Sequence, residues 1–358
     1  MDVQMIVAFT SLSAFLLSAL LVALVLLVSK RYAWFDQHDE RKIHSGQVPR
    51  LGGIGFAIAY ILVVGLATLL YPPLSYGLRF IPVLVAMPLI LVFGIVDDFK
   101  TLRPRYKLLS QIIGAVLVIS AGYTFDRLSF APLGIDISFG LLAYPLTLLW
   151  IVGITNAVNL IDGVDGLAGG VSALAALGYA AIFISTGNER AALLCFALAA
   201  AIGGFLVFNL PLPNARIFMG DGGSQFLGFM LALLPLLDNG RGGMNLQLPY
   251  AAALLLIPIF DTFAAIWRRT RDGRRIDSPD KAHMHHKLMV LGFGSRGVDL
   301  IVYGLQIIVG VLVFFAFKGN GTGRLFFLLG AYGLAGSFFI TIHYLNRAAN
   351  KKAETQGV

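Results

Sequence analysis

The chain has 358 residues, of which 58% are hydrophobic and 13% are charged, and its mean hydropathy is +0.81. This composition excludes an ordinary soluble domain and is typical of a protein that crosses a membrane several times. The formal net charge of +8 does not call for a nucleic-acid partner, because most Lys and Arg residues lie between apolar segments, where they set membrane orientation. Cys195 is the one cysteine, so a disulfide or a cysteine-based metal site within one chain is excluded.

Apolar segments recur along the chain, each close to the ~20 residues that cross a bilayer as a helix. They lack the alternation of barrel strands, so we expect an all-α polytopic membrane protein with about eleven transmembrane helices. The first segment is too long and too weakly charged at its start for a cleaved signal peptide, and we expect it to be retained. With no soluble domain expected, residues 1–358 would form a single transmembrane domain. The expected helices cover residues 6–28, 51–70, 79–96, 108–124, 138–155, 167–185, 191–210, 223–237, 248–266, 299–317 and 324–344.

Positive charge is concentrated in alternate loops. One alternating set, with the C-terminal tail, holds 21 of the 27 Lys and Arg residues. The positive-inside rule places this set in the cytoplasm, with the N-terminus outside and the C-terminus cytoplasmic. We expect the active-site loops to be residues 29–50, 97–107, 156–166, 211–222 and 267–298.

The first of these loops mixes basic residues with a turn, in D-E-R-K-I-H-S-G-Q-V-P-R-L-G-G. By itself this pattern, which ends near Arg50, is a weak signal for phosphate binding.

Two adjacent acids end the third apolar segment, in D-D-F-K-T-L-R-P-R-Y-K. Adjacent like charges disfavour joint ionisation unless a cation is near, so Asp97 or Asp98 is a candidate proton acceptor. The basic residues after them, which include Lys107, are suited to hold phosphate oxygens. For Arg103 and Arg105, a purely topogenic role at a helix end is an equally good interpretation.

The next cytoplasmic loop carries N-A-V-N-L-I-D-G-V-D-G-L-A-G-G, in which Asn156, Asn159, Asp162 and Asp165 recur every three residues. This spacing makes one polar stripe on a helix, whereas the four glycines favour a turn. Either structure gathers amide and carboxylate oxygens beside the membrane, and Mg²⁺ prefers such ligands. The alternative is a turn capped by Asn and Asp side chains.

Asp221 lies between glycines in F-M-G-D-G-G-S, at the start of an expected helix. It is suited either to cap that helix or to bind a metal while the helix N-terminus faces a phosphate. Because the other two acidic motifs lie on the same side of the membrane, we favour the metal.

The loop at 267–298 contains His283, His285 and His286 in H-M-H-H. No cysteine assists them and the flanking charge is basic, so zinc is disfavoured. Imidazole and guanidinium groups are suited to hydrogen-bond a sugar or its phosphates, although a solvated basic loop facing anionic lipid is the alternative. Asp261 and His343 are expected to be structural.

Together these loops provide oxygen ligands for Mg²⁺, a proton acceptor, cations for phosphate and polar contacts for a sugar ring. Transfer of a phosphosugar from a nucleotide diphosphate to a lipid phosphate uses all of them. The membrane would deliver the lipid substrate already oriented.

The chain resembles the polyprenyl-phosphate N-acetylhexosamine-1-phosphate transferase family over nearly its whole length. The motifs V-D-D, N-A-V-N-L-I-D-G-V-D-G-L and F-M-G-D-G-G-S, in this order, carry the resemblance. It implies transfer of an N-acetylhexosamine-1-phosphate from a UDP-sugar to undecaprenyl phosphate, with release of UMP and with Mg²⁺ or Mn²⁺ as cofactor. It also implies a multi-pass protein of the bacterial cytoplasmic (inner) membrane that initiates cell-envelope polysaccharide synthesis. A homodimer is an open expectation.

The resemblance also assigns roles to single residues. Asp221 would be the principal metal ligand, with Asn159 as helper. The catalytic acids would be Asp97 and Asp98, which deprotonate or position the lipid phosphate, and Lys107 would contact phosphate. On the nucleotide side would lie Asp162, Asp165 and Phe218, and on the sugar side His283, His285 and His286.

The histidine motif indicates the branch of the family. The chain has His-Met-His-His where the MurNAc-pentapeptide branch has three consecutive histidines, so it resembles the undecaprenyl-phosphate GlcNAc-1-phosphate transferase branch. A deoxy or 4-keto-derived amino sugar and the MurNAc-pentapeptide reaction are the alternatives.

Two other classes of protein explain the motifs less well. A secondary transporter usually places its acids near the membrane midplane and often has internal repeats, whereas here the acids lie at one interface and no repeat is seen. A membrane scaffold leaves the metal-like constellation unexplained. Within the enzyme class, we favour direct attack by the lipid phosphate over a covalent phosphosugar–enzyme intermediate.

Overall fold

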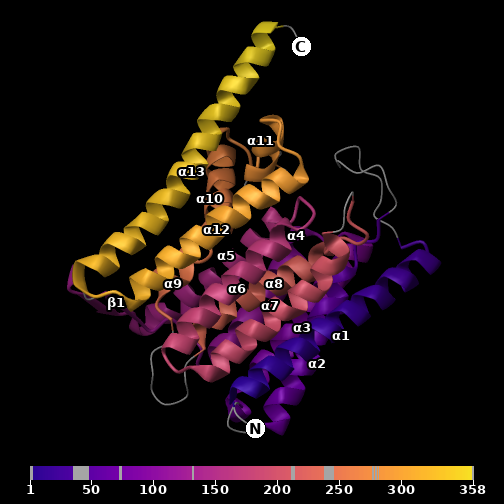
Figure 1. Cartoon of the computed structure of the whole chain (residues 1–358), viewed down its shortest axis with the longest axis vertical. Coiled ribbons are helices and arrows are strands. Elements are labelled where there is room, and N and C mark those ends of the chain that lie inside the picture. The colour runs from indigo at the N-terminus through magenta and orange to yellow at the C-terminus, as the bar shows by residue number, and fades with distance from the viewer. Residues whose placement is uncertain are drawn as a thin grey trace.

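The described part of the chain consists almost entirely of helices, as its apolar segments predict (Figure 1). The structure is a computed structural model that describes residues 3–34, 48–71, 75–130, 133–210, 214–237, 246–275, 278, 280 and 282–356. Backbone polar groups in hydrocarbon have no water to bond, and a helix satisfies them within its own segment. The α-helices of the described ranges are α1 (Val3–Arg31), α2 (Gly52–Leu70), α3 (Ile81–Lys100), α4 (Pro104–Ser120), α5 (Ala143–Ile161), α6 (Leu167–Ser185), α7 (Glu189–Asn209), α8 (Gly220–Leu233), α9 (Leu248–Ala253), α10 (Leu256–Arg271), α11 (Met284–Val290), α12 (Ser295–Lys318) and α13 (Gly321–Gln356).

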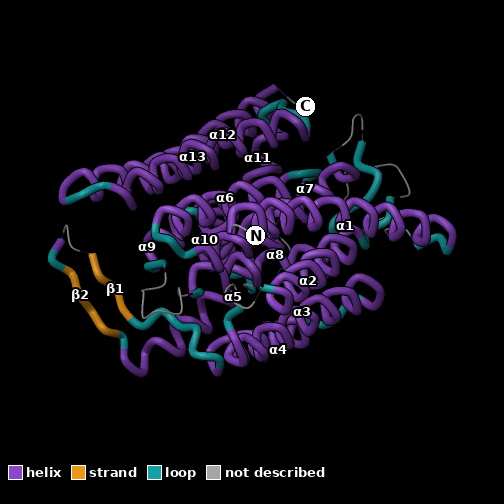
Figure 2. Tube along the Cα trace, turned by 60° about the horizontal axis from the view of Figure 1, so that its bottom comes forward, coloured by secondary structure: helices purple, strands orange, loops and turns teal. Residues whose placement is uncertain are grey.

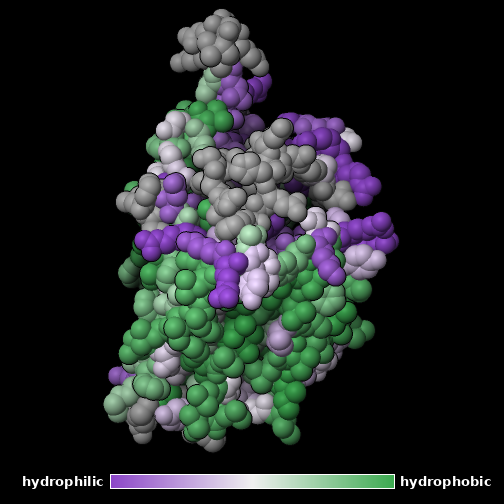
Figure 3. Space-filling model, turned by 90° about the vertical axis from the view of Figure 1, so that its right-hand side faces the viewer, coloured by the Kyte–Doolittle hydropathy of each residue, from purple (hydrophilic) through white to green (hydrophobic). Residues whose placement is uncertain are grey.

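An apolar band surrounds the bundle on the face shown in Figure 3, and polar side chains gather at one end. On α1, for example, Leu12, Leu16 and Leu20 are each 57% exposed. Large exposed apolar surfaces are rare in soluble monomers, whereas lipid tails cover them. Among the described residues, eight helices are long and apolar enough to cross a membrane. The all-α polytopic membrane fold is therefore confirmed, while the exact number of spans and their orientation stay predictions.

The helices do not end where the apolar runs end. α3 continues through Asp97 and Asp98, and α5 continues through Asn159 to Ile161, so these polar residues lie on helices rather than in loops. Hydropathy marks where side chains leave the hydrocarbon, but backbone hydrogen bonding continues for another turn. α3 stops only where Thr101 adopts a left-handed conformation, with φ of 45°.

The structure differs from two further expectations in the C-terminal half, one about a membrane span and one about a loop. The segment expected at 248–266 is two helices, α9 and α10, separated by Leu254 and Leu255. Part of the loop expected at 267–298 forms α11. Parts of the loops expected at 29–50, 211–222 and 267–298 lie outside the described residues.

A short antiparallel hairpin lies at the end of the bundle remote from α11 (Figures 1 and 2). It pairs β1 (Arg127–Phe130) with β2 (Ile135–Ser138), and Arg127 lies opposite Ser138. The hairpin is thus well separated from the polar end, where the acidic motifs lie.

α8 lies at the centre of the bundle (Figure 2). Every residue from Gly222 to Leu233 is buried, and α2, α3, α5 and α6 pack around the helix. A helix that is apolar on all sides is stable only inside such a shell. The N-terminus of α8 opens towards the polar end and carries Asp221 there.

Glycines allow two helices to approach α8 backbone to backbone. A Cβ atom on Gly53 of α2 would lie 2.3 Å from the Cα atom of Gly223, and one on Gly94 of α3 would lie 2.4 Å from the Cα atom of Gly222. Real Cβ atoms do not come so close, so α2 and α3 pack in this way only because these residues lack side chains.

Gly53→Ala should therefore lower the stability of the bundle. Overpacking of a close contact costs about 1–3 kcal/mol, which should appear as a lower thermal unfolding midpoint in a single detergent. Gly65→Ala in the same helix is the matched control, because a Cβ atom there would meet nothing within 4 Å and alanine favours the helix. An equal loss in both variants would contradict the argument.

Candidate active site

The segment before α2 is fastened to the segment before α8 by backbone hydrogen bonds. The Phe218 N–H donates to the Pro49 carbonyl at 2.7 Å, and the Gly52 N–H donates to the Phe218 carbonyl at 2.9 Å. This pairing joins parts of the chain more than 160 residues apart. It brings Arg50, which lies between the paired residues, to the start of α8.

Asp98 holds the N-terminus of α8. Its carboxylate accepts hydrogen bonds from the backbone N–H groups of Asp221 at 2.8 Å and Gly222 at 3.0 Å, and the Arg50 Nε atom lies 3.4 Å away. A helix N-terminus has unpaired N–H groups and a partial positive charge, and both favour a carboxylate there. Gly220, with φ of +77°, leaves no room for a side chain beside Asp98.

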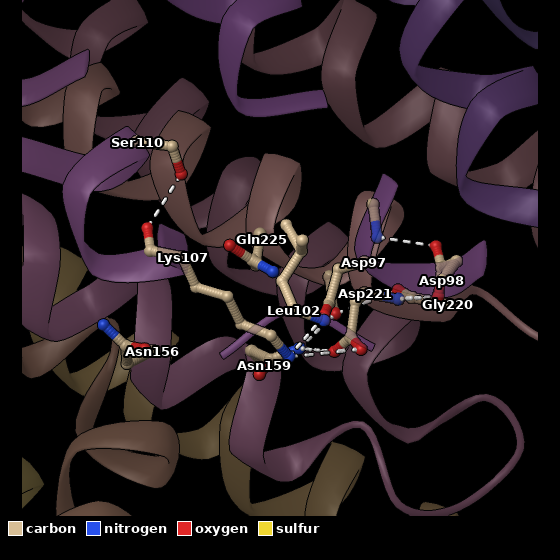
Figure 4. A network of polar contacts seen from close by, with 12 residues as sticks. Asp97, Asp98, Leu102, Lys107, Ser110, Asn156, Asn159, Gly220, Asp221 and Gln225 are labelled. Atoms are coloured by element: carbon tan, nitrogen blue, oxygen red, sulfur yellow. Dashed lines mark hydrogen bonds and ion pairs between the residues drawn. The ribbon is translucent and has the colours of Figure 1, made fainter. Parts of the chain in front are cut away.

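Lys107 and Asn159 converge on the other side of Asp221 (Figure 4). The Lys107 ammonium forms an ion pair with Asp97 and lies 3.6 Å from Asp221 Oδ2. The Asn159 amide donates to Asp221 Oδ1 at 2.8 Å and to the Ser224 hydroxyl at 2.7 Å. Asp97 is fixed further by the Leu102 N–H, which donates to its Oδ1 atom at 2.6 Å. Asp221 is thus the meeting point of α3, α4, α5 and α8.

The three carboxylates differ in their access to solvent. The side chains of Asp97 and Asp98 are 1% and 2% exposed, whereas that of Asp221 is 23% exposed. Lys107 and Arg50 are also open, and the Arg50 Nη2 atom lies 3.7 Å from Asp221 Oδ2. An open carboxylate flanked by two open cations is suited to bind groups that carry both charges, such as a metal–phosphate unit.

Asp162 directly follows α5 and interacts electrostatically with Asp221 and Asp98. Burial disfavours its charged form, and the Asp221 and Asp98 carboxylates add to this effect, so that the pKa of Asp162 is raised to about 8. Asp165 is buried three residues further on.

The turn that carries Asp162 and Asp165 is held from two sides. The Gly166 N–H donates to the Asn209 side chain of α7 at 2.7 Å. The Tyr303 hydroxyl of α12 donates to the Gly166 carbonyl at 2.5 Å, and Arg296 donates to the Asp165 carbonyl at 3.5 Å. The turn is therefore a rigid part of the site rather than a solvated loop.

The histidine motif lies against this turn. A Cβ atom on Gly163 would be 2.4 Å from the His285 Nε2 atom, so the ring packs where Gly163 has no side chain. The His283 and His285 rings are nearly parallel, with centroids 5.9 Å apart, and the His286 ring lies 4.2 Å from that of His285. Burial, and then the neighbouring His286, lower the pKa of His285 to about 3, so this ring is neutral.

Asp261 of α10 anchors the histidine helix. Its two carboxylate oxygens lie 2.7 Å from the His283 Nδ1 atom and 2.7 Å from the backbone nitrogen of Met284, the first residue of α11. An ionised carboxylate only accepts hydrogen bonds, so the hydrogen is on Nδ1 and the other ring nitrogen is left for another contact. The structural role expected for Asp261 thus includes fixing a predicted sugar-binding residue.

The structure brings most of the predicted residues to one end of the bundle. Close to Asp221 lie Asp97, Asp98, Lys107 and Asn159. Asn156, which belongs to the same polar stripe as Asn159, points instead to Gln111. Its side-chain amide donates to the Gln111 Oε1 atom at 2.6 Å. Gln111 also donates from its Nε2 atom to the Gln225 Oε1 atom at 3.2 Å. The sequence motifs did not point to this buried pair, although a glutamine inside an apolar helix is the signal that marks each residue.

A magnesium ion would need few protein ligands here. Among the described residues, no three His, Cys, Asp or Glu side chains form a ready metal-binding group. Mg²⁺ does not require one, since it keeps several waters and binds through one or two carboxylates together with substrate phosphates. The open Asp221 carboxylate is a donor of the kind that Mg²⁺ prefers. The Asn159 Nδ2 group faces Asp221 in this structure, so its amide would have to turn over to add its oxygen. With that turn the donor set fits the ion.

Comparison with known proteins bears on the same region. A family model described as glycosyl transferase family 4 matches residues 80–238. A probable undecaprenyl-phosphate N-acetylglucosaminyl 1-phosphate transferase of Bacillus subtilis (strain 168) is 37% identical over 302 residues, which are 83% of this chain and 82% of that protein. The chain belongs to glycosyl transferase family 4.

Other relatives of this family-4 chain carry similar names. The decaprenyl-phosphate N-acetylglucosaminephosphotransferase of Mycobacterium tuberculosis (strain ATCC 25618 / H37Rv) is 32% identical over an alignment of 363 positions, gaps included, which covers 92% of this chain and 87% of that protein. The undecaprenyl-phosphate alpha-N-acetylglucosaminyl 1-phosphate transferase of Escherichia coli (strain K12) is 29% identical over 302 residues, 81% of this chain and 78% of its own. The family resemblance carried by the sequence motifs is confirmed.

Asp98→Ala should destabilise the protein, because it leaves two N–H groups at the start of α8 without a partner. Each buried unpaired group costs about 1–3 kcal/mol, so the free energy of unfolding in detergent should fall by several kcal/mol. Asp98→Asn keeps one acceptor and should lose less.

Asp136→Ala is the control for this variant, because it removes an exposed carboxylate paired with Arg127. Exposed ion pairs contribute about 0–1 kcal/mol. If Asp98→Ala were no worse than this control, Asp98 would not be holding α8.

Proposed function

We propose that this chain transfers N-acetylglucosamine-1-phosphate from UDP-N-acetylglucosamine to undecaprenyl phosphate and releases UMP. The observation that carries the proposal is the open Asp221 carboxylate between Lys107 and Arg50, at the start of α8 and at the polar end of the bundle. A pyrophosphate and a lipid phosphate both need cations and a metal ligand within a few ångströms, and this is where the described chain provides them. The names of the relatives support the same sugar and the same class of lipid.

Phosphate groups would bind between the two cations. The Lys107 Nζ atom lies 3.6 Å and the Arg50 Nη2 atom 3.7 Å from Asp221 Oδ2. These are ion-pair separations, too long for tight hydrogen bonds. The remaining donors of both side chains are suited to hold phosphate oxygens, with Arg50 as a planar fork and Lys107 as a point charge. Asp97 keeps Lys107 directed at the site through its own ion pair.

Asp221 and Asn159 would hold Mg²⁺, or Mn²⁺, together with phosphate oxygens. When bound, the ion would neutralise the negative charge that develops on the leaving UMP as the phosphoryl group moves to the lipid phosphate. Asp98 keeps the Asp221 carboxylate in place by fixing the first turn of α8, and Asn159 would exchange its hydrogen bond to Asp221 for a contact between its oxygen and the ion.

The two ends of the sugar nucleotide would lie on different walls. Asp162, Asp165 and Phe218 are proposed to contact the uridine side, supported by the rigid turn that carries the two acids. His283, His285 and His286 are proposed to contact the sugar. His285 is neutral. Because its ring packs on Gly163, the proposed sugar-binding histidines adjoin the turn that carries Asp162 and Asp165.

The chemical step is proposed to be a direct displacement. An oxygen of the lipid phosphate attacks the β-phosphorus of the sugar nucleotide, and the bond between that phosphorus and the bridging oxygen breaks, so that the electron pair leaves with UMP. A phosphate monoester has its second pKa near ~6, so at neutral pH much of the nucleophile is already dianionic. Asp97 is proposed to take the proton of the monoanion, because only one of its oxygens accepts from a backbone N–H group and the other pairs with Lys107. Both oxygens of Asp98 accept from backbone N–H groups.

The protein is proposed to work in the bacterial inner membrane, with this site on the cytoplasmic side, because the basic loops lie at that end. Its lipid-linked pyrophosphoryl sugar would then start a cell-envelope polysaccharide. A homodimer stays a prediction. The MurNAc-pentapeptide reaction is less well supported than GlcNAc-1-phosphate transfer, because the relatives above are named for N-acetylglucosamine.

Asp221→Asn keeps the shape of the side chain but removes the charge. Turnover should fall by roughly 100-fold or more, and the Mg²⁺ concentration for half-maximal activity should rise, because a metal ligand has been weakened. The measurement is a Mg²⁺ titration of UMP release, with Asp136→Asn in the remote hairpin as control. A normal Mg²⁺ response in Asp221→Asn would remove the metal role from this residue.

Direct displacement predicts that UMP appears only when the acceptor lipid is present. Purified protein in detergent, incubated with UDP-N-acetylglucosamine and Mg²⁺, should release no UMP until undecaprenyl phosphate is added. One equivalent of UMP per protein without the lipid would indicate a covalent intermediate instead. A panel of UDP-sugars, including UDP-MurNAc-pentapeptide, scored by lipid-linked product, tests the choice of donor; no product from any donor would overturn the proposed function.

A further inference from the structure

A layer of amide side chains lies one helical turn deeper in the bundle than the cluster around Asp221. The members of this amide layer are Gln111 of α4, Asn156 of α5 and Gln225 of α8. Each lies three or four residues from a cluster member on its own helix, the pairs being Lys107 and Gln111, Asn159 and Asn156, and Asp221 and Gln225. Residues with this spacing share one face of a helix, with Cβ atoms about 5–6 Å apart. The three helices that carry the cluster therefore meet a second time just below it.

Hydrogen bonds fix the orientation of each amide in this layer. A backbone carbonyl only accepts, so the nitrogen of Asn156 faces the Val152 carbonyl, at 2.8 Å. The same nitrogen donates to Gln111 Oε1 at 2.6 Å. The Gln111 nitrogen then donates to Asn156 Oδ1 at 3.4 Å and to Gln225 Oε1 at 3.2 Å. The chain of donors and acceptors thus ends at the Gln225 nitrogen.

The Gln225 nitrogen is a buried donor at the end of this chain. Gln225 is 2% exposed, and among the described residues no acceptor lies within hydrogen-bond distance of its Nε2 atom. Turning the amide over would only place this nitrogen against the Gln111 nitrogen, which is also a donor. A buried donor without a partner costs free energy that an apolar side chain of the same shape avoids. Stability alone therefore does not explain why amides lie here.

The amide layer connects two helices that are not close neighbours. α4 packs mainly on α3 and α5, so long side chains make its contact with α8. Gln111 and Gln225 provide such a contact without adding charge. A charged side chain at this depth would compete for Lys107, which already balances Asp97 and lies near Asp221.

We propose that Gln111 and Gln225 are positioning residues of the proposed transferase site. Their hydrogen bond sets how α4 and α8 are turned towards each other, and so sets the separation of Lys107 and Asp221 one turn above, which is 3.6 Å between Nζ and Oδ2. This role rests on the proposed function, in which those two groups hold the phosphates and the ion. A misplacement of about 1 Å at such a site costs roughly 100-fold in rate.

Gln225→Met is the first test, because it removes the unpaired donor while Gln111 keeps its bonds to Asn156. The thermal unfolding midpoint in detergent should be unchanged or higher. The kcat for UMP release should nevertheless fall about 10- to 100-fold, and the Mg²⁺ concentration for half-maximal activity should rise, as is usual for residues that orient a metal site. The KM for UDP-N-acetylglucosamine should stay within about twofold, because the groups that bind it remain.

The double variant Gln111→Met/Gln225→Met tests whether the two glutamines act through their shared hydrogen bond. If they do, the double variant should lose no more kcat than the more affected single variant, since residues that act as one unit are not additive. Losses in kcat that multiply would contradict a shared role.

Gln306→Met is the matched control in a helix away from the site. Gln306 of α12 is also 2% exposed, and its Nε2 atom donates to the Leu254 carbonyl at 2.9 Å. Its Oε1 atom, like the Gln225 nitrogen, is buried and lacks a hydrogen-bond partner among the described residues. The unfolding midpoint should fall because the Leu254 carbonyl loses this donor, while kcat and the Mg²⁺ response should stay as in wild type. An equal fall in kcat here would show a general effect of losing a buried amide and would overturn the proposal.

A second measurement on the same variants does not depend on turnover. Lysine side chains that carry isotope-labelled methyl groups keep their charge, and the Lys107 resonance can be identified by its loss in Lys107→Arg. This resonance should shift in Gln225→Met and stay in place in Gln306→Met. An unshifted resonance or a wild-type kcat in Gln225→Met would overturn the positioning role and leave the proposed function intact. A shifted resonance in a protein that transfers sugar phosphate from no donor would overturn the proposed function instead.

Discussion

The hydrogen bonds from the start of α8 to the Asp98 carboxylate are the constraint on which the rest of the site depends. Two N–H groups of α8 converge on one buried carboxylate, and Arg50 approaches it from the segment before α2. The glycines of α2 and α3 let both helices pack on the α8 backbone, which brings α3 close enough for this contact. The acid that would handle substrate, Asp221, is placed by an acid that does not reach solvent.

Charge balance explains why the cluster is stable without substrate and still able to bind it. Buried carboxylates need partners, and Asp97 and Asp98 have theirs in Lys107 and in the helix N-terminus. Asp221 lies farther from Lys107 and Arg50 than Asp97 and Asp98 do, and its side chain stays partly exposed to solvent. A metal–phosphate unit can therefore replace the longer contacts that Asp221 makes with Lys107 and Arg50, while Asp98 keeps its two backbone N–H donors.

The histidine helix is tied to the same framework from several directions. Asp261 holds its first residues, and the ring of His285 fills the space left by Gly163 on the turn that follows α5. α12 holds that turn through Tyr303 and begins a few residues after α11.

The sequence by itself determined the helical membrane fold and the shared location of the acidic motifs, because hydropathy and the Lys and Arg asymmetry are properties of short segments. It also marked Asp97, Asp98, Lys107, Asn159 and Asp221 as members of one site. Only the tertiary structure decided which acid caps a helix and which is open, since Asp98 and Asp221 are 123 residues apart and their contact is a matter of packing. The same holds for Arg50, Asp261 and Gly163, whose roles arise from what lies across from them rather than from their neighbours in the chain.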